Sequence, residues 1–182
     1  GHQVSAPLPA SIWVEALISA FNNSTAVQEM APPTTAIEHR LVRWMGQMVG
    51  WAEGSGGTLT SGGTEATFTA LLAARAVAMP DAWEAGVGAN PPVVVYGEHC
   101  HYAVARAVGQ LGLGLRNAIA VPTREYRMDT VALVETLDRL AREGRPVMAV
   151  VATAGSTPTG SFDDLEAIGR LCEARDIWLH VD

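Results

Sequence analysis

A glycine-rich turn, TSGGTEA at residues 60–66, leads into a helix-forming stretch and could bind an anion. Its glycines allow a ligand close to the backbone, and Thr64 adds a hydroxyl at the start of the helix. Free N–H groups and the helix dipole favour a phosphate there. The turn therefore predicts a phosphate-binding loop, although the same residues also suit an ordinary turn and cap. It matches neither GxxxxGK[ST] nor GxGxxG, so it does not indicate a nucleoside triphosphate or dinucleotide site.

Two histidines, His99 and His101, follow the apolar run at residues 93–96. Loops at the carboxyl ends of parallel strands hold ligands in open α/β sheets, so one imidazole could stack on a planar cofactor. The ordinary alternative is a histidine that caps a helix or is solvated. No third ligand lies at a spacing typical of a metal site, so no metal is predicted.

Two further polar residues, Thr157 and Asp182, follow consecutive apolar runs in TAGSTPTGSFDD and IWLHVD. Because parallel strands end at the same edge of a sheet, both residues are expected to face one site. A carboxylate there could hold a protonated ring nitrogen. An isolated aspartate after a strand is otherwise a turn former or a helix cap.

The elements that must position these residues are strands and helices in alternation. Short, continuous apolar runs predict buried parallel strands at residues 93–96, 118–121, 147–152 and 177–181. Helical periodicity predicts helices at about 12–21, 35–49, 64–78, 130–143 and 163–175. Asp163 or Ser161 could cap the last helix, and residues 85–92 form a surface loop. This order predicts an α/β fold with a mostly parallel sheet and helices on both faces.

Composition narrows the class of protein. The net charge of −7 and the absence of a basic stripe argue against nucleic acid as a partner. No apolar run approaches the roughly 18 residues of a membrane span, so no membrane partner is predicted. Cys100 and Cys172 lie far apart in apolar surroundings without CxxC spacing, which favours a reducing, cytoplasmic location over disulfides or zinc.

Three segments, TSGGTEATFTALLAARA, HCHYAVARA and TAGSTPTGSFDDL followed by IWLHVD, resemble the group II pyridoxal-phosphate-dependent amino acid decarboxylases. That family includes the aromatic amino acid and glutamate decarboxylases. The resemblance implies a fold type I large domain, incomplete in this chain, in a homodimer with active sites at the interface. It implies pyridoxal phosphate as cofactor and the conversion of an L-amino acid to an amine and CO2. Another fold type I enzyme, an aldehyde-lyase or an aminotransferase, remains an alternative, although TAGSTPTGSFDD favours the decarboxylases.

The resemblance also assigns site residues. It makes Gly63 and Thr64 the phosphate contacts, and His101 the residue that stacks on the pyridine ring. It makes Thr157 a further cofactor contact and Asp182 the partner of the ring nitrogen. An adjacent carboxylate keeps that nitrogen protonated, which allows the ring to accept the electrons left by decarboxylation. His101 and Asp182 are accordingly the expected catalytic residues.

The remaining expectations concern the ends of the chain. Gln3 and Ser5 lie in a segment that resembles the family's substrate-facing region. Residues 1–57 are expected to form an N-terminal helical segment, and residues 58–182 the first part of the cofactor-binding domain. All 12 basic residues counted as Lys and Arg are arginine, so the Schiff-base lysine must lie elsewhere. We therefore expect a fragment that is inactive alone, either part of a decarboxylase or a non-catalytic scaffold, with an amino acid substrate that the sequence does not specify.

Overall fold

The structure is a computed structural model that describes residues 5–182, and its chain divides into two compact units, Gly1–Leu59 and Thr60–Asp182. The first unit contains helix α1 (Pro9–Phe21) and helix α2 (Pro32–Met48). Both helices begin at a proline, three residues before the starts predicted from periodicity, because the fixed φ of proline suits the first turn of a helix. No helix in the described part of the chain is long and apolar enough to cross a membrane. The sequence predicted a domain boundary between residues 57 and 58, and this boundary remains a prediction.

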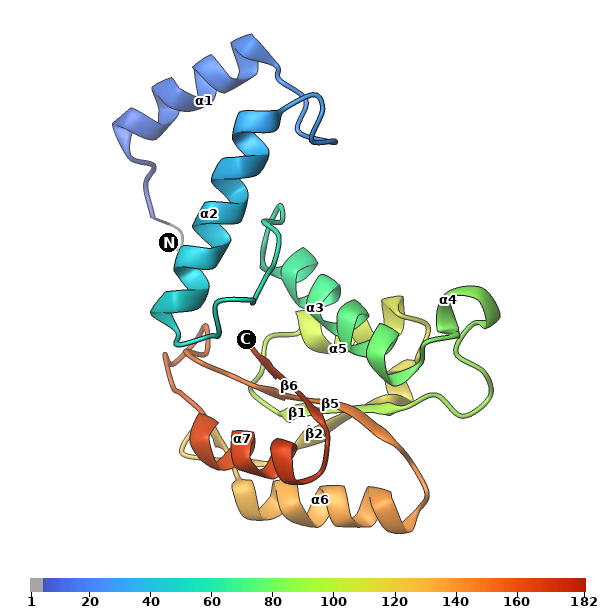
Figure 1. Cartoon of the computed structure of the whole chain (residues 1–182). Helices are drawn as coiled ribbons and strands as arrows, with labels where there is room; N and C mark the ends of the chain where they lie inside the picture. The colour runs from blue at the N-terminus through green and yellow to red at the C-terminus, as the bar shows by residue number, and fades with distance from the viewer. Residues whose placement is uncertain (1–4) are drawn as a thin grey trace. The chain divides into compact units, whose positions relative to one another are not determined.

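The second unit is built on a parallel sheet of four strands in the order β2-β1-β5-β6 (Figure 1). The strands are β1 (Val93–Gly97), β2 (Ala118–Val121), β5 (Val147–Ala152) and β6 (Trp178–Val181). Each coincides with a predicted apolar run to within one residue at either end. The chain moves from β1 outward to β2 and then returns to the other side of β1 for β5. This reversal creates a switch point between β1 and β5, where open α/β sheets commonly bind ligands.

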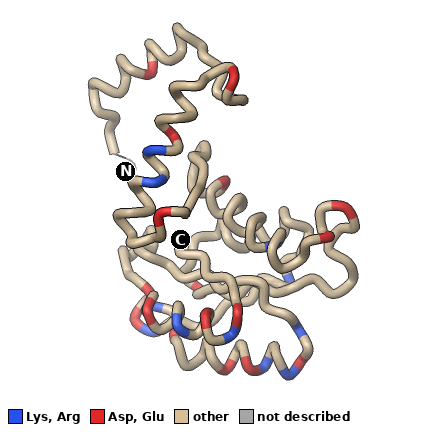
Figure 2. The backbone as a smooth tube through the Cα atoms, viewed as in Figure 1, with Lys and Arg blue, Asp and Glu red and all other residues tan. Residues whose placement is uncertain are grey.

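Helices cover both faces of this sheet (Figure 1). On one face lie α3 (Gly63–Ala78) and α5 (Ala103–Gln110), and on the other α6 (Thr130–Arg142) and α7 (Leu165–Ala174). Leu71 and Val104 pack against Val94 and Ala149 on the first face. Leu133, Ile168 and their neighbours form a second apolar cluster on the other face. Acidic and basic residues intermingle along α6 and α7 (Figure 2).

Several smaller elements were not predicted. Strands β3 (Thr123–Arg124) and β4 (Arg127–Met128) form a short antiparallel hairpin. Its turn residues Glu125 and Tyr126 both have positive φ, 51° and 62°, as in a type I′ turn. The others are helix α4 (Ala82–Ala85) and a 3-10 turn at Leu115–Asn117.

The predicted caps of α7 were wrong. The helix begins at Leu165, and Asp164 caps it by accepting a hydrogen bond from the Ala167 N–H at 2.9 Å. Asp163 instead turns inward and is 8% exposed. Ser161 donates its hydroxyl to the carbonyl oxygen of Tyr126 at 2.7 Å. Both residues are therefore committed to tertiary contacts and do not cap the helix.

Candidate cofactor site

A cavity of about 490 Å³ lies at the carboxyl edge of the sheet, next to the switch point between β1 and β5. The residues that follow β1, β5 and β6 reach it together with the first turn of α3. The structure thus brings five predicted site residues around one space, namely Gly63, Thr64, His101, Thr157 and Asp182. Their chemical roles remain predictions. Ser5 is exposed in the other unit, and Gln3 lies outside the described residues, so the substrate contacts predicted for both also remain predictions.

The first turn of α3 supplies the anion-binding end of the cavity. Gly63 and Thr64 are the first residues of the helix, where N–H groups have no acceptor within the helix. Glu65 in the same turn could repel an anion, but its Oε2 accepts hydrogen bonds from the Ser61 N–H at 2.9 Å and the Ser61 hydroxyl at 2.6 Å. These bonds hold the pKa of Glu65 below its usual value and direct its charge toward Ser61. The end of the cavity is therefore suited to a phosphate.

His101 is held in one orientation on the wall of the cavity. Its Nδ1 accepts a hydrogen bond from the Ala103 N–H at 3.2 Å, so in the neutral ring the proton lies on Nε2. The ring also contacts Tyr102, with 4.3 Å between ring centroids, and the Arg106 guanidinium lies 5.1 Å from the Tyr102 centroid. The histidine is thus both a cap for α5 and a fixed flat surface beside the cavity. Nearby, His99 is exposed, and its ring contacts Tyr126 at 5.7 Å.

Asp182 continues the pairing of β6 with β5 beyond the end of the strand. Its N–H donates to Ala152 O at 2.8 Å, and its carbonyl oxygen accepts from the Ala154 N–H at 2.7 Å. These bonds fix the backbone of Asp182 beside the loop that follows β5. Because side chains alternate along a strand, Asp182 and His180 share the face opposite Leu179, which packs near α7. Asp182 is the acidic residue among those that line the cavity.

The loop after β5 carries Thr157 and is closed by a cluster of hydroxyl groups. Ser156 Oγ lies within hydrogen-bonding distance of Thr159 Oγ1 and of Ser161 Oγ, and Thr159 Oγ1 lies 2.8 Å from Ser161 Oγ. Ser161 donates onward to Tyr126 O, which anchors the loop to the β3–β4 hairpin. Thr157 is thus presented to the cavity by a loop with a defined shape.

Several lining residues were not singled out from the sequence. Thr67, Tyr102, Thr153 and Ser156 also line the cavity. The sequence held a signal for three of them: Tyr102 adjoins His101, Thr153 directly follows the strand predicted at residues 147–152, and Ser156 adjoins Thr157. Thr67 lies one turn beyond Gly63 and donates its hydroxyl to Gly63 O at 2.9 Å.

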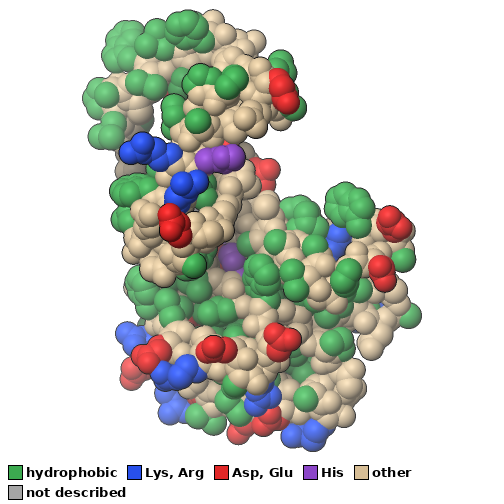
Figure 3. Space-filling view, in the orientation of Figure 1, with side chains coloured by type: hydrophobic (Ala, Val, Ile, Leu, Met, Phe, Trp, Pro, Cys, Tyr) green, Lys and Arg blue, Asp and Glu red, His purple; other side chains and the backbone are tan. Residues whose placement is uncertain are grey.

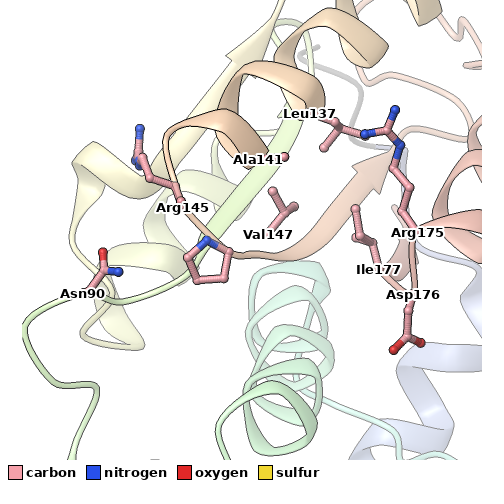
Figure 4. Close-up of a pocket in the computed structure, with 10 residues that line it drawn as sticks. Asn90, Leu137, Ala141, Arg145, Val147, Arg175, Asp176 and Ile177 are labelled. Atoms are coloured by element: carbon pink, nitrogen blue, oxygen red, sulfur yellow. The ribbon is translucent and has the colours of Figure 1, made fainter.

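A larger hollow, of about 700 Å³, lies at the amino edge of the sheet (Figure 4). Arg145 and Arg175 stand on opposite sides of it. Each already has a partner: Arg145 donates to Asn117 Oδ1 at 2.8 Å, and Arg175 to Asp138 Oδ1 at 2.7 Å. The guanidinium groups of Arg145 and Arg175 are therefore engaged in contacts within the protein. We place the functional site at the smaller cavity, where the polar groups converge.

A helix N-terminus, a fixed imidazole and a carboxylate around a switch-point cavity define an α/β protein whose site has groups suited to a phosphate-bearing ring cofactor. Among residues 5–182, no group of three or more His, Cys, Asp or Glu side chains is placed to hold a metal ion. Comparison with known proteins identifies the class more closely. Residues 4–182 match the family described as the pyridoxal-dependent decarboxylase conserved domain, and the chain belongs to this family.

The relatives span several amino acid decarboxylases. The chain is 37% identical over 173 residues to an L-2,4-diaminobutyrate decarboxylase of Rhizobium meliloti, covering 94% of the chain and 34% of the relative. It is 31% identical over 176 residues to human cysteine sulfinic acid decarboxylase, covering 96% of the chain and 36% of the relative. The chain therefore spans about a third of the length of these curated relatives.

A solved structure shares the fold over the whole chain. The crystal structure of the glutamate decarboxylase domain of a diaminobutyrate-pyruvate transaminase and L-2,4-diaminobutyrate decarboxylase from Vibrio parahaemolyticus superposes with a TM-score of 0.92 at 29% identity. That match covers 100% of this chain and 41% of the solved one. The predicted fold class, an incomplete fold type I large domain, is thereby confirmed, as is pyridoxal phosphate as the cofactor of the family.

Proposed function

We propose that the protein containing this chain is a pyridoxal-phosphate-dependent decarboxylase that converts an L-amino acid to the corresponding amine and CO2. The observation that carries the proposal is the convergence of Gly63, Thr64, His101, Thr157 and Asp182 on one cavity. The family assignment supports the same reaction. When bound, the cofactor supplies an electron-accepting ring.

The residues of this chain would bind and orient that cofactor. The N–H groups of the first turn of α3 and the Thr64 hydroxyl would hold its phosphate. The fixed imidazole of His101 would lie against the ring, which restricts its orientation. Thr157 would add a contact from the loop after β5.

Asp182 would hold a proton on the ring nitrogen. Two backbone hydrogen bonds to the region around β5 fix the main chain of Asp182, so its side chain starts from a fixed position at the edge of the cavity. A negative charge at hydrogen-bonding distance favours the protonated form of a pyridine nitrogen. Asp182 would therefore control the electronic state of the cofactor.

The test is made in the intact polypeptide that contains these residues. We expect Asp182→Ala to abolish release of CO2 from amino acids and to weaken binding of pyridoxal phosphate. Product analysis distinguishes the reaction class: CO2 and an amine support a decarboxylase, whereas an aldehyde or a keto acid would contradict the proposal.

The substrate class is proposed from the relatives. The two curated relatives described above are named as decarboxylases of 2,4-diaminobutyrate and of cysteine sulfinic acid. We propose that the substrate is likewise an amino acid with a charged side chain. Decarboxylation of an aromatic amino acid in preference to 2,4-diaminobutyrate, glutamate and cysteine sulfinate would contradict this.

We further propose a homodimer in the cytoplasm, with its active sites at the interface between subunits. Helix α1 has no buried residue, and large apolar side chains cover it (Figure 3). Trp13 is 74% and Phe21 81% exposed. An apolar surface of this kind is typical of a protein interface, and a second copy is the proposed partner. Cys100 and Cys172 are free thiols, which fits a reducing compartment.

A further inference from the structure

Cys100 lies between β1 and His101 and contacts the carboxylate of Asp182. Its Sγ is 3.9 Å from Asp182 Oδ2, within the range of a weak S–H···O hydrogen bond. The side chain of Thr153 lies near enough to the thiol to lower its pKa. As expected, Cys100 packs against an apolar cluster on one face of the sheet, and its thiol also lies beside Asp182, which lines the cofactor cavity.

Cys172 provides a comparison within the same chain. It is 2% exposed and packs among Leu133, Ile168 and other apolar residues. Burial raises the pKa of both thiols to about 11. For Cys100 the nearby side chain of Thr153 acts in the opposite direction, while the negative charge of Asp182 adds to the rise. Both thiols therefore carry a proton at neutral pH, but only that of Cys100 has a carboxylate acceptor beside it.

The Asp182 side chain needs such a donor because its backbone bonds do not fix its carboxylate. The terminal torsion of an aspartate has a broad energy minimum, so the two oxygens are poorly held by the chain itself. A donor on Oδ2 would limit rotation and leave Oδ1 for a second partner.

We propose that Cys100 is a positioning residue for Asp182: its thiol donates to Oδ2 and orients the carboxylate toward the ring nitrogen of pyridoxal phosphate. This inference rests on the proposed role of Asp182. The thiol acts as a hydrogen-bond donor and stays protonated throughout, so no covalent step is involved.

The contact is tested first without cofactor, by infrared spectroscopy of the S–H stretch in the intact apo polypeptide. The difference between wild type and Cys100→Ala isolates the Cys100 band, and the difference between wild type and Cys172→Ala isolates the control band. We expect Asp182→Ala to shift the Cys100 band toward the frequency of an unbonded thiol and to leave the Cys172 band in place. An unmoved Cys100 band would overturn the inference.

The positioning role is tested by the dissociation constant for pyridoxal phosphate. We expect Cys100→Ala to weaken binding roughly three- to tenfold, and Cys100→Ser, which keeps a donor, to restore much of it. Cys172→Ala should bind as wild type does. Equal loss in the Ala and Ser variants, or no loss in either, would overturn the positioning role. Unchanged affinity in Asp182→Ala would instead contradict the proposed function, independently of the infrared result.

Discussion

Asp163 and Thr153 are joined by two reciprocal hydrogen bonds across the loop that follows β5 and lines the cavity. The Thr153 N–H donates to Asp163 Oδ2 at 2.7 Å, and the Asp163 N–H donates to Thr153 O at 2.9 Å. The other carboxylate oxygen accepts the Met128 N–H at 2.6 Å. One buried side chain thus ties the carboxyl end of β5 to β4, and fixes the position from which Thr153 meets the cavity.

We predict that Asp163→Asn destabilises the protein by about 2–3 kcal/mol, because an amide group would place an N–H donor against a backbone N–H donor in a buried site. The measurement is the free energy of unfolding in urea. The neighbouring Asp164→Asn is the control, since asparagine caps a helix about as well as aspartate. Equal losses in the two variants would show that the buried carboxylate does not stabilise the loop.

The second prediction concerns the wall of the cavity at Gly63. A methyl group at this position meets no protein atom within 4 Å, so Gly63→Ala should leave the free energy of unfolding nearly unchanged. The same methyl would take up space at the proposed phosphate site and should weaken binding of pyridoxal phosphate roughly tenfold. Fluorescence titration of the intact apo polypeptide measures this.

Gly62→Ala is the matched control. A methyl at Gly62 also meets no atom within 4 Å, and Gly62 does not line the cavity. Its φ of 171° is extended backbone that alanine adopts. If Gly62→Ala weakens cofactor binding as much as Gly63→Ala does, the effect comes from the turn and the proposed phosphate site is wrong.

The sheet was predictable from the sequence because its two central strands, β1 and β5, are almost wholly buried and its edge strands are also apolar. The runs at residues 118–121 and 147–152 coincide with β2 and β5, since each is continuous and apolar and has a proline at one end. Their order in the chain also indicated which residues would meet at the carboxyl edge. Thr157 and Asp182 were expected at one edge of the sheet because parallel strands all end at the same edge.

The hydrogen bonds that hold the loops around the cavity were not predictable from the sequence in this way. In SFDD, Ser161, Asp163 and Asp164 are all plausible helix caps by local chemistry. Their different uses depend on Tyr126 and Met128 in the hairpin, which is distant in sequence. That hairpin is short, and its Glu125–Tyr126 turn lacks the glycine or asparagine that usually marks a type I′ turn. The contact between Cys100 and Asp182 likewise joins positions 82 residues apart.

The third prediction is a dependence of stability on pH that originates at His180. Its Nε2 is buried without a hydrogen-bond partner in the described structure. Burial lowers the pKa of this imidazole below 6.5, and the charge of Asp182 opposes the shift only in part. The folded state therefore binds a proton less readily than the unfolded state. The contribution of the neutral His180 to the free energy of unfolding is therefore complete above about pH 6.5. This contribution is lost as the pH falls below about 6.5 and through the lowered pKa of the folded state.

His180→Leu should remove this part of the acid sensitivity, because the substituted side chain does not titrate. The free energy of unfolding, measured at pH 7.5 and at pH 5.5, should fall less between the two values in the variant than in wild type. His39→Gln, at an exposed position, should retain the wild-type dependence. An unaltered pH dependence in His180→Leu would contradict the assignment.

The last prediction tests the proposed interface at α1. Trp13, Leu17 and Phe21 are all more than half exposed, and Glu15 is the one charged residue of the helix. If a second copy covers this surface, Trp13→Glu places a charge in an apolar contact. We expect the dissociation constant of the homodimer to rise roughly thirtyfold, corresponding to about 2 kcal/mol for loss of a central tryptophan.

Sedimentation equilibrium of the intact polypeptide measures this constant, and Glu135→Lys on the exposed side of α6 is the control for a change of surface charge. The apolar helix and the cofactor site belong to different units of the chain, so the variant should keep the unfolding behaviour of the sheet. A dimer equally stable in Trp13→Glu and Glu135→Lys would mean that something other than a second copy covers α1. Because the proposed active sites lie at the subunit interface, dissociation should also reduce CO2 release in proportion to the fraction of monomer.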